Sequence, residues 1–121
     1  MRRPDSRPRK MVVARFQISA ANNGKQLAIQ VGDELLVELP ENPTTGYRWQ
    51  VNSSGEASLT LDRDNFELPS NALPGASGVR LITFRATVAG RSKLRLELRR
   101  PWEQGKSAIQ EFAVPIEVRP R

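Results

Sequence analysis

The sequence predicts an all-β protein, an immunoglobulin-like β-sandwich of seven to eight antiparallel strands without a disulfide. Three observations carry this prediction. Apolar and polar residues alternate through short stretches, which is the period of a strand with one buried face. Clusters of Gly, Pro, Asn, Asp and Ser separate these stretches, as in sandwiches. No stretch has the i, i+3, i+4, i+7 pattern of an amphipathic helix, and the 121 residues include no cysteine.

The first half of the chain predicts four strands. Residues 11–19 are apolar enough for a first edge strand, although their alternation is poor. The pair Asn23 and Gly24 then favours a tight turn, because both residue types accept positive φ. The next strands are expected at residues 27–31, 34–39 and 47–52, with the inward-facing sets Leu27, Ile29, Val31; Leu35, Val37, Leu39; and Tyr47, Trp49, Val51.

The second half predicts the remaining strands. Residues 59–66 form a weaker strand that is broken by the polar run 62–65, and the prolines and glycines of residues 67–78 indicate a long loop. Further strands are expected at residues 79–87, 93–99 and 110–118. Pro115 falls on the outward set of the last one, and proline cannot donate to a ladder, so we expect an edge strand or a bulge there.

The net charge of +6 is unevenly distributed. Residues 1–10 carry five cationic side chains and one acidic one, so they hold four of the six net positive charges. They contain no apolar residue beyond Met1, and we expect them to be a flexible basic tail before a single domain at residues 11–121. A basic arm that binds nucleic acid or a membrane surface is the alternative interpretation of this tail.

The residue types exclude most enzyme classes. The chain has no histidine and no cysteine, which removes imidazole bases, Ser-His-Asp and Cys-His catalysis, and the common zinc sites. Asp62 and Asp64 resemble the start of a calcium loop without its other ligands. Adjacent carboxylates such as Asp33 and Glu34 point to opposite faces of a strand, so they cannot act as a glycosidase pair. We expect no enzyme, no cofactor and no metal.

Targeting signals are also absent from the printed chain. No stretch reaches the roughly twenty apolar residues of a membrane span. The apolar residues 11–14 are followed at once by Arg15, too short for the apolar region of a signal peptide. We therefore expect a protein that does not associate with membranes. It would be cytoplasmic, or exported if a signal was removed.

The loop at residues 42–49, with the sequence Asn-Pro-Thr-Thr-Gly-Tyr-Arg-Trp, joins two of the expected strands. Pro43 fixes its φ, Thr44 and Thr45 have few rotamers, and Gly46 accepts positive φ without steric cost. A loop of this composition is stiff, which suits a binding surface. Turn chemistry alone is the other explanation of the same residues.

This motif has two companions, the Gly-Ala-Ser-Gly turn at residues 75–78 and Arg-Pro-Trp at residues 100–102. In this order and spacing, over about residues 22–118, the chain resembles the chagasin family of cysteine-peptidase inhibitors. Ser77 stands where the family usually has glycine. In a sandwich, alternate loops emerge at the same end, so the three motifs are expected side by side.

The resemblance implies that three loops plug the active-site cleft of a papain-like, cathepsin L-like cysteine peptidase, reversibly and without covalent chemistry. Thr44 would lie nearest the catalytic thiolate, the glycine-rich turn would follow the unprimed side, and Trp102 would lie on the primed side. Asn42 and Thr45 would hold the central loop by local hydrogen bonds. The implied peptidase-binding residues are Asn42, Pro43, Thr44, Thr45, Gly46, Gly75, Ala76, Ser77, Gly78, Arg100, Pro101 and Trp102.

Two alternatives stay open at this point. An immunoglobulin-like adhesion or carbohydrate-binding module could use Tyr47 and Trp102 to stack on a sugar, although Tyr47 and Trp49 are expected in the core. Trp102 itself is either an exposed anchor or a plug over the open end of the sandwich. Nucleic-acid binding rests on the tail alone and is not expected, and the free protein is expected to be a monomer.

Overall fold

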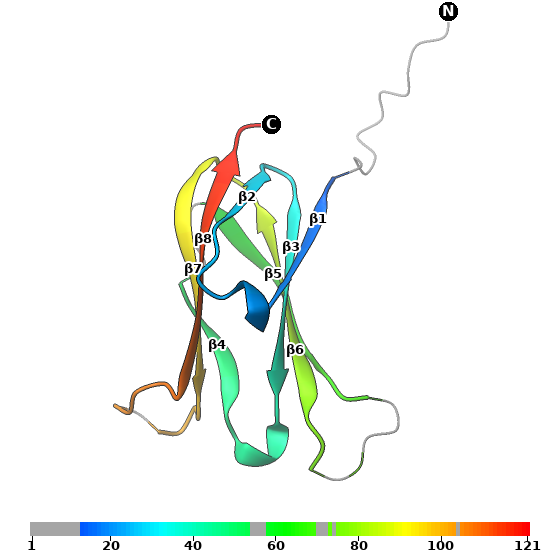
Figure 1. Ribbon diagram of the computed structural model, residues 1–121, viewed down its shortest axis with the longest axis vertical. Helices are drawn as coiled ribbons and strands as arrows, with labels where there is room; N and C mark the ends of the chain where they lie inside the picture. Colours follow the sequence, from blue (N-terminus) through cyan, green and yellow to red (C-terminus); the bar gives the residue numbers. More distant parts are fainter. Residues whose placement is uncertain (1–12, 54–57, 70–72, 74, 104) are drawn as a thin grey trace, which may run out of the picture.

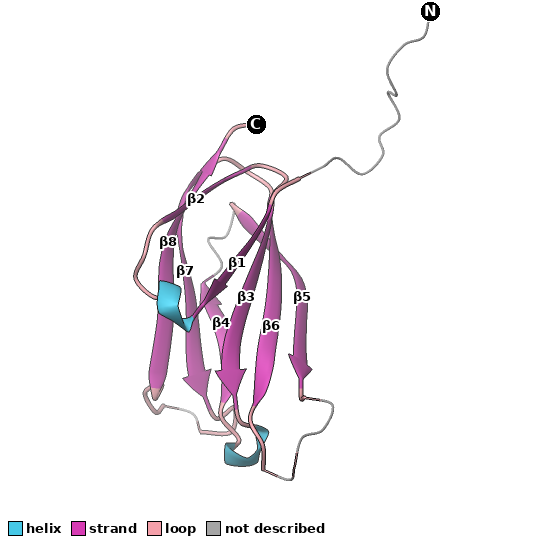
Figure 2. Cartoon of the chain, turned by 45° about the vertical axis from the view of Figure 1, so that its right-hand side comes forward, coloured by secondary structure: helices cyan, strands magenta, loops and turns pink. Residues whose placement is uncertain are grey.

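The computed structural model describes residues 13–53, 58–69, 73, 75–103 and 105–121. The expected tail at residues 1–10 and the start of the first expected strand lie outside this part. Two four-stranded sheets pack face to face, with the strand orders β1-β3-β6-β5 and β2-β8-β7-β4 (Figures 1 and 2), so the predicted β-sandwich is confirmed. The strands are β1 Arg15–Ser19, β2 Leu27–Gln30, β3 Glu34–Glu41, β4 Arg48–Ser53, β5 Leu59–Glu67, β6 Gly78–Ala86, β7 Gly90–Arg99 and β8 Gln110–Arg119. Two 3₁₀ turns, η1 Ala20–Asn22 and η2 Pro43–Thr45, complete the described elements.

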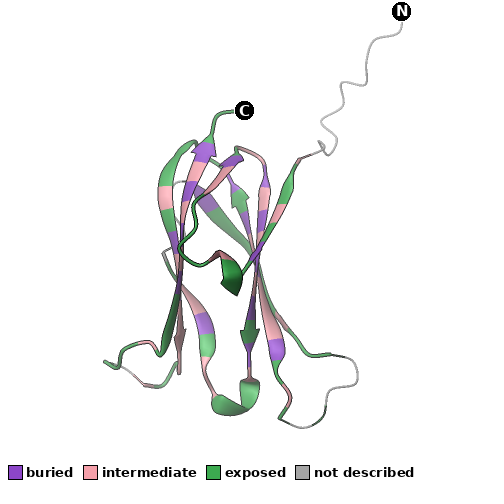
Figure 3. Ribbon diagram, in the orientation of Figure 1, coloured by how far each residue is buried: buried purple, intermediate pink, exposed green. Residues whose placement is uncertain are grey.

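The core lies between the two sheets and follows the alternation of the sequence. Along β3 and β8 buried residues alternate with less buried ones, as the banding of Figure 3 shows, and in the middle of β7 Leu94 and Leu96 are buried. The inward side chains are nearly inaccessible, at 0% for Leu35, Val37 and Leu94. At roughly 25 cal/mol for each Å² of apolar surface removed from water, this double layer is the main source of stability in a chain without disulfides.

Two strand pairs correct the expectation that all strands are antiparallel. β1 pairs with β3 and β2 pairs with β8 in parallel, while the other four pairs are antiparallel. The turn through Asn23 and Gly24 does not close a hairpin, because β1 and β2 belong to different sheets. The chain therefore crosses from one sheet to the other and back before it forms β3, and this crossing allows β1 and β3 to run in the same direction.

The position of the last strand corrects a second expectation. β8 lies between β2 and β7, and its pairing with β7 has no bulge at Pro115. The backbone of Ala113 faces the β2 side, where its N–H donates to Asn23 Oδ1 and its carbonyl accepts from Gly24. By the period of two, the nitrogen of Pro115 faces the same side, just before β2 begins to pair at Ile116. The N–H that Pro115 lacks would therefore point to a place where β8 has no β2 residue to pair with.

The strand β5 is continuous, which corrects the expected break at residues 62–65. A bulge between Leu61 and Arg63 absorbs one residue, and the two aspartates pair with arginines of β6, Asp64 with Arg80 at 3.1 Å and Asp62 with Arg85 at 3.7 Å. Cross-strand ion pairs make a polar run compatible with a strand. In the described residues no group of three or more potential metal ligands comes together.

At the end of the sandwich away from η2, the buried carboxylate of Asp33 joins several segments. It accepts hydrogen bonds from the backbone N–H of Gln30 at 2.8 Å and of Ala14 at 3.3 Å, and from Arg121 Nη2 at 2.5 Å. The residue is only 2% exposed. Asp33 therefore ties the turn between β2 and β3 to the start of β1 and to the segment after β8. Among the described elements, no helix is long or apolar enough to cross a membrane.

We expect Asp33→Ala to lower the free energy of unfolding by on the order of 3 kcal/mol, because two partly buried N–H groups lose their acceptor and each costs about 1–3 kcal/mol. Arg121→Ala is the matched control. It removes only the partner whose side chain is 42% exposed, and should cost about 1 kcal/mol or less. Urea denaturation measures both, and equal losses would contradict the assigned role of the backbone contacts.

Candidate functional site

The three loops that carry the sequence motifs lie at the same end of the sandwich. The central loop joins β3 to β4 through η2, the glycine-rich loop joins β5 to β6, and the Trp102 loop joins β7 to β8. Figures 1 and 2 both place these connections at the lower end of the molecule, away from the described start and end of the chain. The structure thus brings the predicted site residues to one pole.

The central loop is held in shape by its own polar groups. The side-chain oxygen of Asn42 accepts from the backbone N–H of Thr44 at 3.0 Å and from its hydroxyl at 2.7 Å. Thr45 Oγ1 donates to the carbonyl of Asn42 at 2.9 Å and accepts from the N–H of Tyr47 at 3.2 Å. Asn42 is therefore the N-cap of η2, as an asparagine before a helical turn usually is.

Pro43 and Gly46 set the two ends of this 3₁₀ turn. Pro43 occupies its first position, where a missing N–H costs nothing. Gly46 follows with φ 80° in the left-handed region, and its N–H donates to the carbonyl of Pro43 at 3.2 Å. Thr44 and Thr45 lie between them and are exposed. The loop therefore exposes two threonines on a backbone that is ordered within this chain, without a bound partner protein.

Arg100 clamps the Trp102 loop onto the central loop. Its Nε donates to the carbonyl of Thr45 at 3.0 Å, and its guanidinium lies 4.3 Å from the centre of the Tyr47 ring and 6.0 Å from that of Trp102. Nη1 also reaches Glu103 at 3.4 Å. The Arg100 side chain makes these contacts within the molecule, so it fixes the Trp102 loop against the central loop in the free protein.

Trp102 lies over Gly46 and is 66% exposed. A Cβ atom added to Gly46 would come within 2.3 Å of its Cη2 atom, so only glycine permits this approach. The indole is therefore exposed and does not plug the core. Beside it a shallow groove of about 630 Å³ is lined by Pro43, Thr44, Thr45, Gly46, Arg48, Pro101 and Trp102.

The glycine-rich loop begins and ends at a narrow neck. A Cβ atom on the buried Gly78 would lie 2.4 Å from the Glu67 carbonyl oxygen and 2.5 Å from the Phe66 ring, so the two ends of the loop touch there. Gly75 takes φ 82° and, like Ser77, is exposed, while Ala76 is half-buried and donates its N–H to the Leu73 carbonyl at 3.0 Å.

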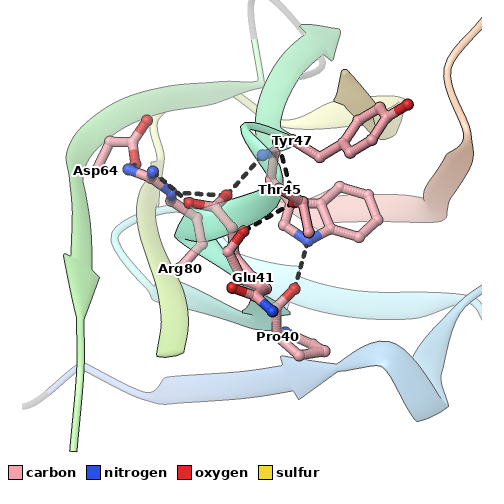
Figure 4. Close-up of polar contacts among 8 residues, drawn as sticks. Pro40, Glu41, Thr45, Tyr47, Asp64 and Arg80 are labelled. Carbon is pink, nitrogen blue, oxygen red and sulfur yellow. Dashed lines mark hydrogen bonds and ion pairs between the residues drawn. The ribbon is translucent and has the colours of Figure 1, made fainter. Parts of the chain in front are cut away.

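A buried ion pair lies beneath the loops (Figure 4). Glu41, at the end of β3, is 4% exposed and bonds Arg80 of β6 through both oxygens, at 2.6 and 3.2 Å. The same carboxylate accepts the N–H of Trp49 at 2.7 Å, while the Trp49 indole N–H donates to the Pro40 carbonyl at 2.9 Å. The hydrogen bond to Glu41 raises the pKa of Arg80 against the opposing effect of burial. Arg80 also pairs with Asp64 at 3.1 Å.

Comparison with known proteins gives the family. Residues 28–116 match the model of the chagasin family of peptidase inhibitors. The chain belongs to the chagasin family. It is 30% identical to chagasin of Trypanosoma cruzi over 103 residues, which are 81% of this chain and 93% of that protein. It is also 28% identical to amoebiasin-2 of Entamoeba histolytica, over 77% of this chain and 76% of that protein.

A solved structure agrees in fold. The crystal structure of a cysteine protease inhibitor from Entamoeba histolytica superposes with a TM-score of 0.79 at 22% identity, over 91% of this chain and all of that one. The family consists of peptidase inhibitors, so the expectation that the chain is not an enzyme is confirmed. The family resemblance read from three short motifs is confirmed as well.

Glu41 is a residue of the site that the motifs of this chagasin-family chain do not include. The inward positions of β3 run through Leu35, Val37 and Leu39, and the next one is occupied by a carboxylate. A charged residue on the inward set of a strand needs a buried partner, and that signal was present in the sequence. Trp49 is in the core as expected, at 3% exposure, whereas Tyr47 is only half-buried beneath Arg100.

Gly46→Ala should displace Trp102 and weaken inhibition of a cysteine peptidase by at least about tenfold, because the added methyl occupies the space of the indole and φ 80° is strained for alanine. Gly24→Ala is the matched control, since Gly24 has φ 81° with no atom within 4 Å of the added Cβ. It carries the strain without the clash. A similar loss in both variants would assign the effect to backbone strain alone.

Arg80→Met should lower the free energy of unfolding by about 3–5 kcal/mol, because it leaves the Glu41 carboxylate buried without a cation. Arg85→Met is the control, since the Arg85 side chain is 50% exposed and its ion pairs are 3.7 Å or longer. It should cost less than about 1 kcal/mol. Thermal and chemical denaturation test this ranking, and the reverse order would contradict the importance of the buried pair.

Proposed function

We propose that this chain is a reversible, non-covalent inhibitor of papain-like cysteine peptidases, and that the three loops together occlude the active-site cleft. The observation that carries the proposal is the position of the three motif loops at one pole, with a central loop ordered by its own hydrogen bonds. Membership in a family of peptidase inhibitors supports it.

The conformation of the central loop explains why it would block a peptidase without being cleaved well. A protease binds its substrate as an extended strand, whereas residues 43–45 form a 3₁₀ turn closed by Asn42 and Gly46. Extending this loop would break the bonds from Thr44 and Thr45 to Asn42. Thr44, exposed at the tip, is our candidate for the residue nearest the catalytic thiolate. No chemistry from this chain is needed.

The flanking loops would add contact area on the two sides of the cleft. Of the six large hydrophobic side chains that are exposed among the described residues, four lie on these loops, Leu68 and Leu73 on one and Trp102 and Ile109 on the other. Exposed apolar residues gathered at one pole are typical of a docking surface. We propose that the glycine-rich loop follows the unprimed side with its backbone, and that Trp102 covers the primed side in an interface of roughly 1,200–2,000 Å².

Preorganisation is the energetic reason why such an interface would be tight. Each side chain that is immobilised on binding costs about 0.5–1.5 kcal/mol. In the free chain Arg100, Thr44 and Thr45 are already held by internal contacts. Most of the interaction free energy is then available for affinity.

The other candidate functions find less support. The Tyr47 ring faces the Arg100 guanidinium at 4.3 Å, so it is not free to stack on a sugar, and Trp102 alone remains. Nucleic-acid binding would depend on residues 1–10, outside the described part of the chain. We propose residues 11–121 as the inhibitory domain, a monomer when free.

Titration of papain and of a cathepsin L-like enzyme tests the proposal, and we expect full inhibition at micromolar concentration or below. Thr44→Arg should weaken this inhibition by at least about 100-fold, because a bulky cation cannot enter the cleft, while the thermal midpoint changes by less than about 2 °C for an exposed residue. Unchanged peptidase activity at micromolar wild-type protein would reject the proposal.

Thr60→Arg supplies the matched control for this variant. Thr60 is an exposed threonine near the start of β5, in register with Arg85 at the opposite end of the sandwich. It introduces the same charge and bulk away from the loops, so inhibition should remain within about twofold of wild type. A large fall in the thermal midpoint of Thr44→Arg would instead assign Thr44 to the fold.

A further inference from the structure

Arg48 occupies a position at the binding pole that the family motifs do not explain. It is the first residue of β4, directly after the central loop, and its side chain is exposed on the outer face of the sheet. Together with Thr44 and Trp102 it lines the shallow groove beside the central loop. A cation therefore borders the surface that we propose to contact the peptidase.

The cross-strand neighbour of Arg48 is another arginine. Register places Arg48 opposite Arg99 of β7, and like charges in directly opposed positions destabilise a sheet. Arg99 is already engaged, since its Nε binds Glu97 at 2.7 Å and its Nη1 donates to the Lys106 carbonyl. Within the described residues Arg48 has no acidic partner. Arg99 is thus compensated by Glu97, whereas the charge of Arg48 has no acidic side chain bonded to it.

The charges around the pole are distributed asymmetrically. Arg48, Arg99 and Lys106, which we call the basic flank, lie on the side of β4 and β7, and the Lys106 side chain is exposed. The described acidic side chains on β7, on the start of β8 and on the loop between them are paired with other arginines, Glu97 with Arg99, Glu103 with Arg100 and Glu111 with Arg95. On the opposite side, β5 ends with the exposed Glu67. This polarity would orient an approaching charged surface.

We infer that the basic flank, through Arg48 on its edge strand, binds carboxylates on the rim of the peptidase cleft next to Trp102. The inference rests on the proposed function and adds a determinant of target choice, namely peptidases with an acidic primed-side rim. Complementary charge at the rim of an interface acts mainly on the association rate and on the rejection of wrong partners. An unfavourable pair in the free protein is then relieved by the partner.

The experiment compares Arg48→Gln and Arg48→Glu with the control Arg91→Gln. Arg91 is an exposed arginine of the same strand as Arg99, paired in register with Glu117 near the far end of β7. Association rates are measured at low and high salt against two papain-like peptidases, one with acidic and one with basic side chains around the primed side of its cleft. All three variants are also followed by thermal denaturation.

For the acidic enzyme at low salt, Arg48→Gln should slow association about 5- to 10-fold and Arg48→Glu more, with the difference shrinking at 0.5 M salt as charges are screened. Arg91→Gln should stay within about twofold. For the basic enzyme, Arg48→Glu should not slow association. The thermal midpoint of Arg48→Glu should be unchanged or raised, because an acid then faces Arg99.

Equal effects of Arg48→Gln and Arg91→Gln on the acidic enzyme would overturn the inference, as would equal losses of Arg48→Glu on both enzymes. A lowered midpoint of Arg48→Glu together with weaker inhibition would assign Arg48 to the fold and overturn it too. Failure of the proposed function looks different, because the wild-type protein would then inhibit neither enzyme.

Discussion

The loop-bearing end of the molecule depends on one buried carboxylate. Glu41 is bonded to Arg80 within its own sheet and to the backbone of Trp49 in the opposite sheet, so it joins the two layers directly beneath the central loop. Arg80 continues the connection to Asp64 on the edge strand β5. Because a buried charge tolerates few geometries, the bases of the central and glycine-rich loops keep a fixed separation. The local bonds of Asn42 and the clamp of Arg100 then order the tips above this base.

Most of the fold could be predicted from the sequence, because burial dominates it. The alternation of Leu94, Leu96 and Leu98 or of Phe112, Val114 and Ile116 leaves only one face for the core. Strand direction and neighbours could not be predicted in the same way. They depend on which sheet each strand joins, and the Asn-Gly turn after β1 reads as a hairpin although it crosses between sheets. The prediction of an edge strand or a bulge at Pro115 was wrong for the same reason. A proline is accepted at this position of β8 because β2 begins to pair only at Ile116.

The parts of the site that could be predicted are those whose conformation is set by the residue types of the motif itself. Asn42, Pro43 and Gly46 have types that specify a capped turn, and the structure contains that turn. The Arg-Pro-Trp motif was expected beside the central loop, and the structure shows how Arg100 holds it there, through the Thr45 carbonyl and the Tyr47 ring. The support beneath the loops was missed because Glu41, Arg80 and Asp64 are far apart in sequence. Only the pairing of β3, β6 and β5 brings them together.

The neck at Gly78 separates the glycine-rich loop from the scaffold. Since Glu67 and Phe66 leave no room for a side chain there, the two ends of the loop are held against each other at the edge of the scaffold. A loop closed in this way can change in length at small cost, roughly 0.6 kcal/mol for each doubling. Evolution, or an engineer, is then free to exchange the intervening residues for others and to redirect the protein toward a new enzyme while the two sheets remain unaltered.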